Sequence, residues 1–211
     1  MRRLPVLPAY GAVAAAEVVL AGVHRRRARR VTKPLLMPLL AVHLAQAGKG
    51  QRAADRGVLA GLVLSGVGDV ALLGEGEAAF GAGLASFLAA HCCYIAAFAR
   101  RRRGGVRRSP PLAACFVLAW AVLSLVLAPR TGRLRAPVLV YGTALVAMAL
   151  AALETGDPLT AAGGGAFLVS DSLLALGAFD VASVPQGDAL VMLTYVAAQA
   201  LITEGTVRAD G

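Results

Sequence analysis

The chain has 211 residues, of which 58% are hydrophobic and 16% are charged, and its mean hydropathy is +0.69. Soluble domains carry about 25% charged residues, so this composition excludes an ordinary soluble protein and indicates a polytopic membrane protein. The formal net charge of +9 does not indicate a nucleic-acid partner, because the arginines form short clusters between apolar runs, where they anchor helices to anionic lipid headgroups.

Eight apolar runs follow one another along the chain. Most approach the length of about 20 residues that a helix needs to cross a bilayer. They predict an all-α fold, a transmembrane bundle of eight helices that forms a single domain over residues 1–211. The second and eighth runs are the shortest, and Pro34 is expected to open the second helix. The predicted spans are residues 5–23, 34–47, 57–73, 78–99, 111–128, 136–153, 160–178 and 189–202.

The basic residues predict an orientation. With alternating spans, twelve of them fall on the side of the N-terminus and nine on the opposite side. The positive-inside rule then places the N-terminus in the cytoplasm, and a bacterial inner (plasma) membrane is the expected location. Arg2 and Arg3 precede an apolar stretch as in a signal peptide, but the stretch continues to Val23. We therefore expect an uncleaved first helix.

The cysteines give no indication of a disulfide framework or a metal site. Cys92 and Cys93 are adjacent, and Cys115 is distant in sequence. Neighbouring helical residues point about 100° apart, which makes His91 and the two adjacent cysteines a poor chelate. No metal and no cofactor are expected, and the sequence leaves the oligomeric state open.

Asp69 is the first residue that demands a functional explanation. It ends the segment Ser65-Gly66-Val67-Gly68-Asp69 inside an apolar run. A charged side chain at the centre of a bilayer costs about 2.5–3.5 kcal/mol on insertion scales, so it usually faces a polar cavity and has a role. Ser65 and Asp69 are four residues apart and share a helix face. The simpler explanation is that Asp69 joins two helices by a hydrogen bond.

Asp171 is a second intramembrane acid, preceded by Ser170 in another apolar run. Two carboxyl groups in unequal surroundings can divide their work, one donating a proton while the other stays ionised. Counting along the alternating spans places Lys33, Asp69 and Asp171 in the same half of the bundle, away from the termini. Lys33 is either an anchor at the membrane interface or a counter-charge for a phosphate headgroup.

Further polar side chains occur at membrane depth. His91 and Tyr94, three residues apart, share a helix face, and so do Tyr195 and Gln199, four apart. These four are candidates for substrate binding, although a single histidine in an apolar run is more often a core residue. The remaining polar residues at this depth are Glu17, His43 and Tyr141.

Five groups of residues together resemble the YhhN-like lysoplasmalogenase family of integral membrane proteins. They are Lys33-Pro34-Leu35-Leu36-Met37-Pro38; Gly68-Asp69 with Leu72; Phe80, Gly83, Leu84, Phe87, His91 and Tyr94; Gly165 to Asp171 with Ala175; and Tyr195 with Gln199. Their order and spacing match along nearly the whole chain, while the fifth and sixth spans match in hydropathy alone.

The resemblance implies eight spans and a lysophospholipid substrate. The implied reaction is hydrolysis of the vinyl ether bond of lysoplasmalogens to a fatty aldehyde and glycerophospho-ethanolamine or -choline. It also implies that Asp69 and Asp171 are the catalytic acids. The residues expected to bind substrate are Lys33, Ser65, His91, Tyr94, Ser170, Tyr195 and Gln199. Acid–base catalysis by two carboxyl groups suits this reaction, as in glycosidases. Which aspartate donates the proton stays open.

Two other functions compete with this one. Gly66-Val67-Gly68-Asp69 spells the Gly-x-Gly-Asp motif of presenilin-type intramembrane aspartyl proteases, but here the second aspartate follows it rather than precedes it, and no Pro-Ala-Leu motif occurs. An ion- or proton-coupled transporter could use the same two acids to bind a cation. Transporters often have broken helices, and Gly163-Gly164-Gly165 could break the seventh span.

Overall fold

The computed structural model describes residues 6–48 and 52–209, and this part of the chain is entirely helical apart from its connections. Arg2 and Arg3 lie outside the described residues. The helices are α1 (Val6–Gly22), α2 (Arg26–Gln46), α3 (Ala53–Ala71), α4 (Glu77–Ala99), α5 (Gly105–Arg108), α6 (Pro110–Leu127), η1 (Gly132–Leu134), α7 (Arg135–Glu154), α8 (Pro158–Ala178) and α9 (Gly187–Arg208).

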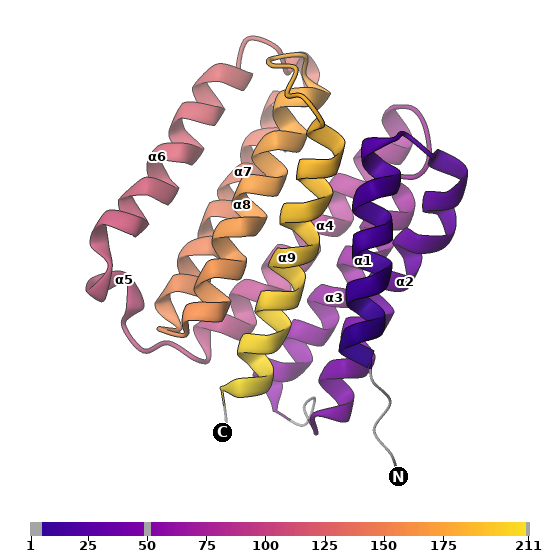
Figure 1. Cartoon of the computed structure of the whole chain (residues 1–211). Helices are drawn as coiled ribbons and strands as arrows, with labels where there is room; N and C mark the ends of the chain where they lie inside the picture. Colours follow the sequence, from indigo (N-terminus) through magenta and orange to yellow (C-terminus); the bar gives the residue numbers. More distant parts are fainter. Residues whose placement is uncertain (1–5, 49–51, 210–211) are drawn as a thin grey trace.

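The long helices run side by side along one axis, and both ends of the chain lie at the same end of the bundle (Figure 1). The most extensive packing joins α8 to α9 and α3 to α4, while α1 packs on α2 and α9, and α4 packs on α7. Helix α6 lies at the edge and buries only Ala113, Phe116 and Leu127. The end opposite the termini is formed by the α1–α2, α3–α4, α6–α7 and α8–α9 connections.

Each predicted apolar range overlaps one long helix, but the prediction for α2 was wrong about where the helix begins. Pro34 was expected to open it, whereas α2 begins at Arg26 and holds both Pro34 and Pro38 in its interior. A proline inside a helix removes one backbone hydrogen bond. Here the first two turns carry four arginines and form one wall of a polar cavity described below. Helix α9 is also longer than its apolar range, from Gly187 to Arg208.

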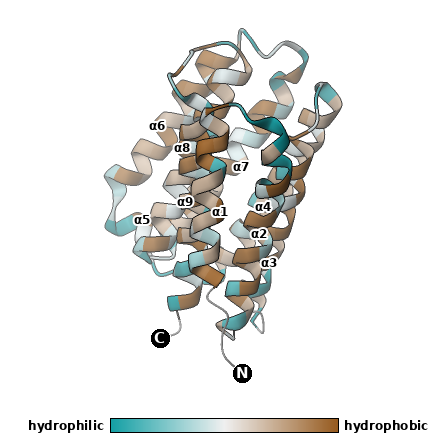
Figure 2. Ribbon diagram, turned by 45° about the vertical axis from the view of Figure 1, so that its right-hand side comes forward, coloured by the Kyte–Doolittle hydropathy of each residue, from teal (hydrophilic) through white to brown (hydrophobic). Residues whose placement is uncertain are grey.

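Five of the described helical segments are long and apolar enough to cross a membrane, which makes this an integral membrane protein. They are Glu77–Ala99, Pro110–Leu127, Gly132–Glu154, Pro158–Ala178 and Gly187–Arg208, and the shorter helix Val6–Gly22 is apolar as well. Hydrophilic stretches gather mostly near the two ends of the bundle (Figure 2).

Polar side chains lie inside the bundle while many aliphatic side chains lie on its outer surface. Glu17, His91 and Gln199 are fully buried, whereas Val67 and Leu125 are more than half exposed. This distribution is the reverse of that in a soluble protein, and it fits a surface that contacts lipid.

Small residues allow the helices to approach closely. A Cβ atom at Gly61 would lie 2.4 Å from the ring of Tyr94, and one at Gly163 would lie 2.8 Å from the side chain of Ile202. The triple glycine 163–165 does not break α8, which is continuous from Pro158 to Ala178. Glycine lets backbones meet where lipid offers no hydrophobic drive for helix association.

Gly61→Ala is expected to destabilise the protein by about 1–3 kcal/mol, because the added methyl group would overlap the buried Tyr94 ring. The matched control is Gly81→Ala on α4, whose methyl group would meet nothing within 4 Å. Alanine favours a helix over glycine by about 1 kcal/mol, so the control should be neutral or slightly stabilising. Thermal unfolding in detergent compares the two, and equal melting temperatures would contradict the packing argument.

Candidate active site

Asp69 lies in the last turn of α3 with almost no exposed surface. Lys33 Nζ, from α2, lies 3.2 Å from its Oδ1 atom, and the Tyr195 hydroxyl, from α9, donates a hydrogen bond of 2.7 Å to Oδ2. The negative end of the α3 dipole disfavours a carboxylate here, so the ion pair is what makes the charge tolerable. Asp69 therefore ties three helices together.

The hydrogen bonds continue from Tyr195 into the bundle. Gln199 Nε2 lies 3.4 Å from the Tyr195 hydroxyl, and the Tyr94 hydroxyl donates to Gln199 Oε1 at 2.7 Å. Ser65 Oγ is buried nearby on α3 and makes no hydrogen bond to a described residue. Lys33, Asp69, Tyr195, Gln199 and Tyr94 thus form one connected group, which we call the Asp69 network.

Asp171 lies on α8 and belongs to a second polar group. The Tyr141 hydroxyl, from α7, donates a hydrogen bond to its Oδ2 atom. His91 Nε2, from α4, lies 3.6 Å from the same oxygen and 3.2 Å from the Tyr141 hydroxyl. His91 is fully buried, and its Nδ1 atom makes no hydrogen bond to a described residue. We call Asp171, Tyr141 and His91 the Asp171 group.

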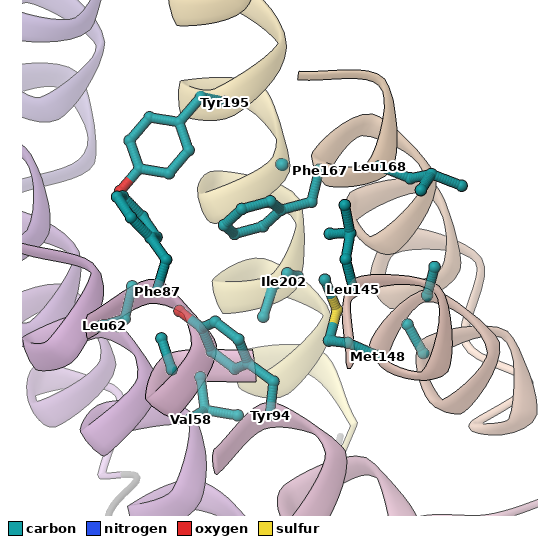
Figure 3. Close-up of a cluster of buried hydrophobic side chains, with 14 of the residues drawn as sticks. Val58, Leu62, Phe87, Tyr94, Leu145, Met148, Phe167, Leu168, Tyr195 and Ile202 are labelled. Carbon is teal, nitrogen blue, oxygen red and sulfur yellow. The ribbon is translucent and has the colours of Figure 1, made fainter. Parts of the chain in front are cut away.

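An aromatic cluster connects the two acids. Helices α3 and α8 do not pack directly on one another along their described lengths. Tyr195, which binds Asp69, contacts Phe167 with ring centroids 5.5 Å apart, and Phe167 contacts His91 at 4.9 Å. Phe87 contacts both Phe167 and Tyr195, and Figure 3 shows these three rings turned toward one another. Among the described residues, Asp69 and Asp171 share no hydrogen-bond partner, and aromatic rings lie between their two groups.

A cavity of about 400 Å³, the apolar cavity, lies between α4, α6, α7 and α8. Its wall is mostly apolar, and its lining residues with polar side chains are Trp120, Ser124, Thr131, Arg135, Tyr141 and Asp171. Trp120 also lines it, with a buried indole N–H that makes no hydrogen bond to a described residue. Leu125 and Leu139 belong to the same wall and are exposed on the outer surface, so the cavity reaches the lipid-facing side of the bundle.

A second cavity, of about 610 Å³, lies at the end of the bundle opposite the termini, and we call it the basic vestibule. Its charged and ionisable lining residues are His24, Arg26, Arg29, Arg30, Lys33, Glu75 and Asp188. Leu72 and Phe80 line both this cavity and the apolar one. A polar chamber and an apolar chamber therefore adjoin, with Lys33 in the wall of the first and Asp171 in the wall of the second.

Some predicted site residues lie elsewhere. Ser170 donates a hydrogen bond to the carbonyl oxygen of Val191 at 3.0 Å, which joins α8 to α9. Asp69, Tyr94, Tyr195 and Gln199 line none of the three cavities described for this structure, so in this conformation they contact one another. Within residues 6–48 and 52–209, no cluster of three or more His, Cys, Asp or Glu side chains could share a metal ion.

Sequence reasoning did not assign a role to Tyr141, Trp120 or Glu17. Glu17 is fully buried, lies 2.7 Å from Arg29 Nε and also accepts a hydrogen bond from Thr32. Tyr141 and Glu17 carried the same signal as His91, a polar side chain in an apolar run. Trp120 carried no signal, because tryptophan is ordinary in a membrane helix.

The fold and these cavities define an integral membrane helical bundle with buried acids beside chambers suited to an amphiphile. The family model of the YhhN family matches residues 28–206, so the chain belongs to the YhhN family. No solved structure matches the chain.

Curated relatives carry the name lysoplasmalogenase. The chain is 39% identical to human lysoplasmalogenase TMEM86B over 150 residues, which are 70% of this chain and 62% of the relative. It is 32% identical to human lysoplasmalogenase TMEM86A over 156 residues, 71% of this chain and 65% of the relative. A lysoplasmalogenase of Mycobacterium bovis is 35% identical over 137 residues, 60% of this chain and 51% of the relative. The chain thus spans between half and two-thirds of these relatives.

Lys33→Met is expected to destabilise the protein by about 3–5 kcal/mol, because it leaves Asp69 buried without its counter-charge. Arg27→Met, an exposed residue of the same helix, is the matched control and should change stability little. The double variant Lys33→Met/Asp69→Asn should recover part of the loss. Chemical unfolding in detergent measures all three, and equal effects of Lys33→Met and Arg27→Met would contradict the importance of the pair.

Proposed function

We propose that this protein is a membrane hydrolase that cleaves the vinyl ether bond of lysoplasmalogens. The observation that carries the proposal is the junction of the apolar cavity with the basic vestibule at Leu72 and Phe80. A lysoplasmalogen has one hydrocarbon chain and a phosphate headgroup, so its two ends suit the two chambers. The names of the curated relatives support the same substrate class.

The reaction requires a proton at carbon. Protonation of the vinyl carbon farther from the ether oxygen produces an oxocarbenium ion, and water adds to the carbon that bears the oxygen. The resulting hemiacetal loses its hydroxyl proton and breaks its bond to the glycerol oxygen, which takes up a proton. Overall one water is consumed, and a fatty aldehyde and a glycerophospho compound are released. A positioned carboxylic acid supplies such a proton and, once ionised, accepts one from the attacking water.

Asp171 is the aspartate that we assign to the reacting carbon. It is the acid in the wall of the apolar cavity, and Tyr141 and His91 fix its Oδ2 atom. Its other oxygen is left for the substrate. Low-polarity walls strengthen its electrostatic effect on an oxocarbenium ion.

Asp69 has the supporting role in this proposal. It lines neither chamber, and it holds the ammonium of Lys33 at the wall of the basic vestibule. Asp171 therefore acts at the reacting carbon, and Asp69 holds the ammonium of Lys33 in position.

Asp171→Asn is expected to lower aldehyde release from an alkenyl glycerophosphoethanolamine by about 100-fold or more, because amide nitrogen cannot replace the acid. Asp69→Asn should also lower it, since Lys33 loses its counter-charge and the amide has only one acceptor oxygen where Lys33 and Tyr195 use two. Asp180→Asn, in the exposed α8–α9 connection, is the matched control and should keep full activity. Purified protein in detergent and an aldehyde assay are sufficient.

Two outcomes would redirect the proposal. Full activity in both Asp69→Asn and Asp171→Asn would contradict the assignment of roles to the two acids. Wild-type protein that releases no aldehyde, yet drives proton-coupled uptake of a solute into liposomes, would favour a transporter.

All eight long helices cross the membrane in this proposal, with the N-terminus in the cytoplasm of a bacterial cell. The support comes from α2 and α3, which expose aliphatic side chains as the more apolar helices do. These exposed residues are Val31, Leu35, Val63 and Val67. The basic vestibule would then open on the outer face of the plasma membrane.

Ser183→Cys in the α8–α9 connection tests this orientation. With Cys92, Cys93 and Cys115 replaced by alanine, the new thiol should react with a membrane-impermeant maleimide in intact cells. Reaction only after permeabilisation would reverse the orientation.

A further inference from the structure

Most of the cationic side chains that line the basic vestibule form an ion pair with a carboxylate. Arg26 Nη1 lies 2.5 Å from Glu75, Arg29 Nε lies 2.7 Å from Glu17, and Lys33 Nζ lies 3.2 Å from Asp69. Three of the four lining cations are therefore matched by one carboxylate each. The fourth cation, Arg30, makes no ion pair or hydrogen bond with a described residue and is exposed.

One carboxylate of the vestibule also remains without a permanent counter-charge. Asp188, at the start of α9, lies 3.3 Å from His24 Nδ1 and 58% of its side chain is exposed. If His24 is counted as neutral, the vestibule has one cation, Arg30, and one anion, Asp188, that form no ion pair with an oppositely charged side chain. This combination is complementary to a ligand that carries one phosphate and one ammonium group.

The start of α2 provides further hydrogen-bond donors for a phosphate group. Helix α2 begins at Arg26 without a side-chain cap, so N–H groups of its first turn have no side-chain acceptor, and Arg30 follows one turn later. A helix N-terminus favours a phosphate group through these N–H groups and the helix dipole. Arginine matches phosphate geometry with two parallel N–H donors.

We propose that the basic vestibule distinguishes headgroups by charge, with Arg30 binding the phosphate and Asp188 binding the ammonium of a zwitterionic lysophospholipid. The inference rests on the proposed function for the identity of the lipid chain and its bond. It assigns two specificity residues at the mouth of the site, away from Asp69 and Asp171. A lysolipid with a phosphate but no amine is therefore a poorer ligand.

Two substrates separate the roles. One is an alkenyl glycerophosphoethanolamine, and the other is the alkenyl glycerophosphate without an amine. Arg30→Gln should raise KM about tenfold for both, because both lose a charge-assisted hydrogen bond, and should leave kcat near its original value. Asp188→Asn should raise KM about fivefold for the ethanolamine substrate only. For the amine-free substrate it should leave KM unchanged or lower it.

Arg27→Gln is the matched control, since Arg27 lies on the same turns of α2 as Arg26, Arg29 and Arg30 but does not line the vestibule. It should change neither KM. Equal KM values for wild-type protein and Arg30→Gln, or equal losses for both substrates in Asp188→Asn, would overturn the proposal.

A binding measurement makes the test independent of catalysis. Trp120 is the single tryptophan of the chain and lines the apolar cavity, so its fluorescence reports entry of a lipid chain. Saturated alkyl-ether analogues of the two substrates have no vinyl group to cleave. Discrimination between these analogues by wild-type protein, lost in Asp188→Asn, would support headgroup recognition even if no aldehyde forms. Aldehyde release without any such discrimination would overturn this inference and leave the proposed hydrolysis standing.

Discussion

The buried ion pair between Lys33 and Asp69 is the interaction on which the arrangement of this bundle depends. It joins α2 to α3, and the hydrogen bond from Tyr195 adds α9. Neither charge is tolerable alone in an apolar interior, so the three helices must lie where the pair can form. The position of α2 is the clearest consequence. To bring Lys33 to Asp69, its helix extends back to Arg26, and three arginines, Arg26, Arg29 and Arg30, are thereby held around a chamber at the end of the bundle.

The two acids stand out in the sequence more clearly than their surroundings do. Asp69 and Asp171 were recognisable because a carboxylate in an apolar run is costly wherever the helix packs. The same reasoning placed Lys33 in the same half of the bundle, and the structure brings it to Asp69. The all-α fold and the order of the long helices followed from hydropathy alone. These are properties that each segment carries by itself.

Partners across helices could not be predicted in this way. Tyr141 reaches Asp171 from a helix with no motif, and the assignment of Tyr94 and Gln199 to substrate binding ignored that the two bind each other. Pro34 was misleading because proline opens helices more often than it interrupts them, and only the packing of α2 decides between the two. Contacts between distant segments depend on helix rotation, and an apolar run in lipid constrains rotation weakly.

The two acidic centres differ in how completely their hydrogen bonds are satisfied. Asp69 uses both oxygens, and the Tyr195, Gln199 and Tyr94 side chains that follow are bonded to one another. The Asp171 group is different, since His91 Nδ1 and the neighbouring indole N–H of Trp120 make no bond to a described residue. A buried network that serves only stability gains from satisfying every member, because each unmatched donor costs about 1–3 kcal/mol. Ser65 is the unmatched hydroxyl near Asp69, and it lines neither the apolar cavity nor the basic vestibule. Of the unmatched groups, only the Trp120 N–H belongs to a residue that lines the apolar cavity together with Asp171, whereas His91, like Ser65, lines neither chamber. In the proposed reaction the Asp171 side receives the polar ligand atom, and the Asp69 side is its fixed support.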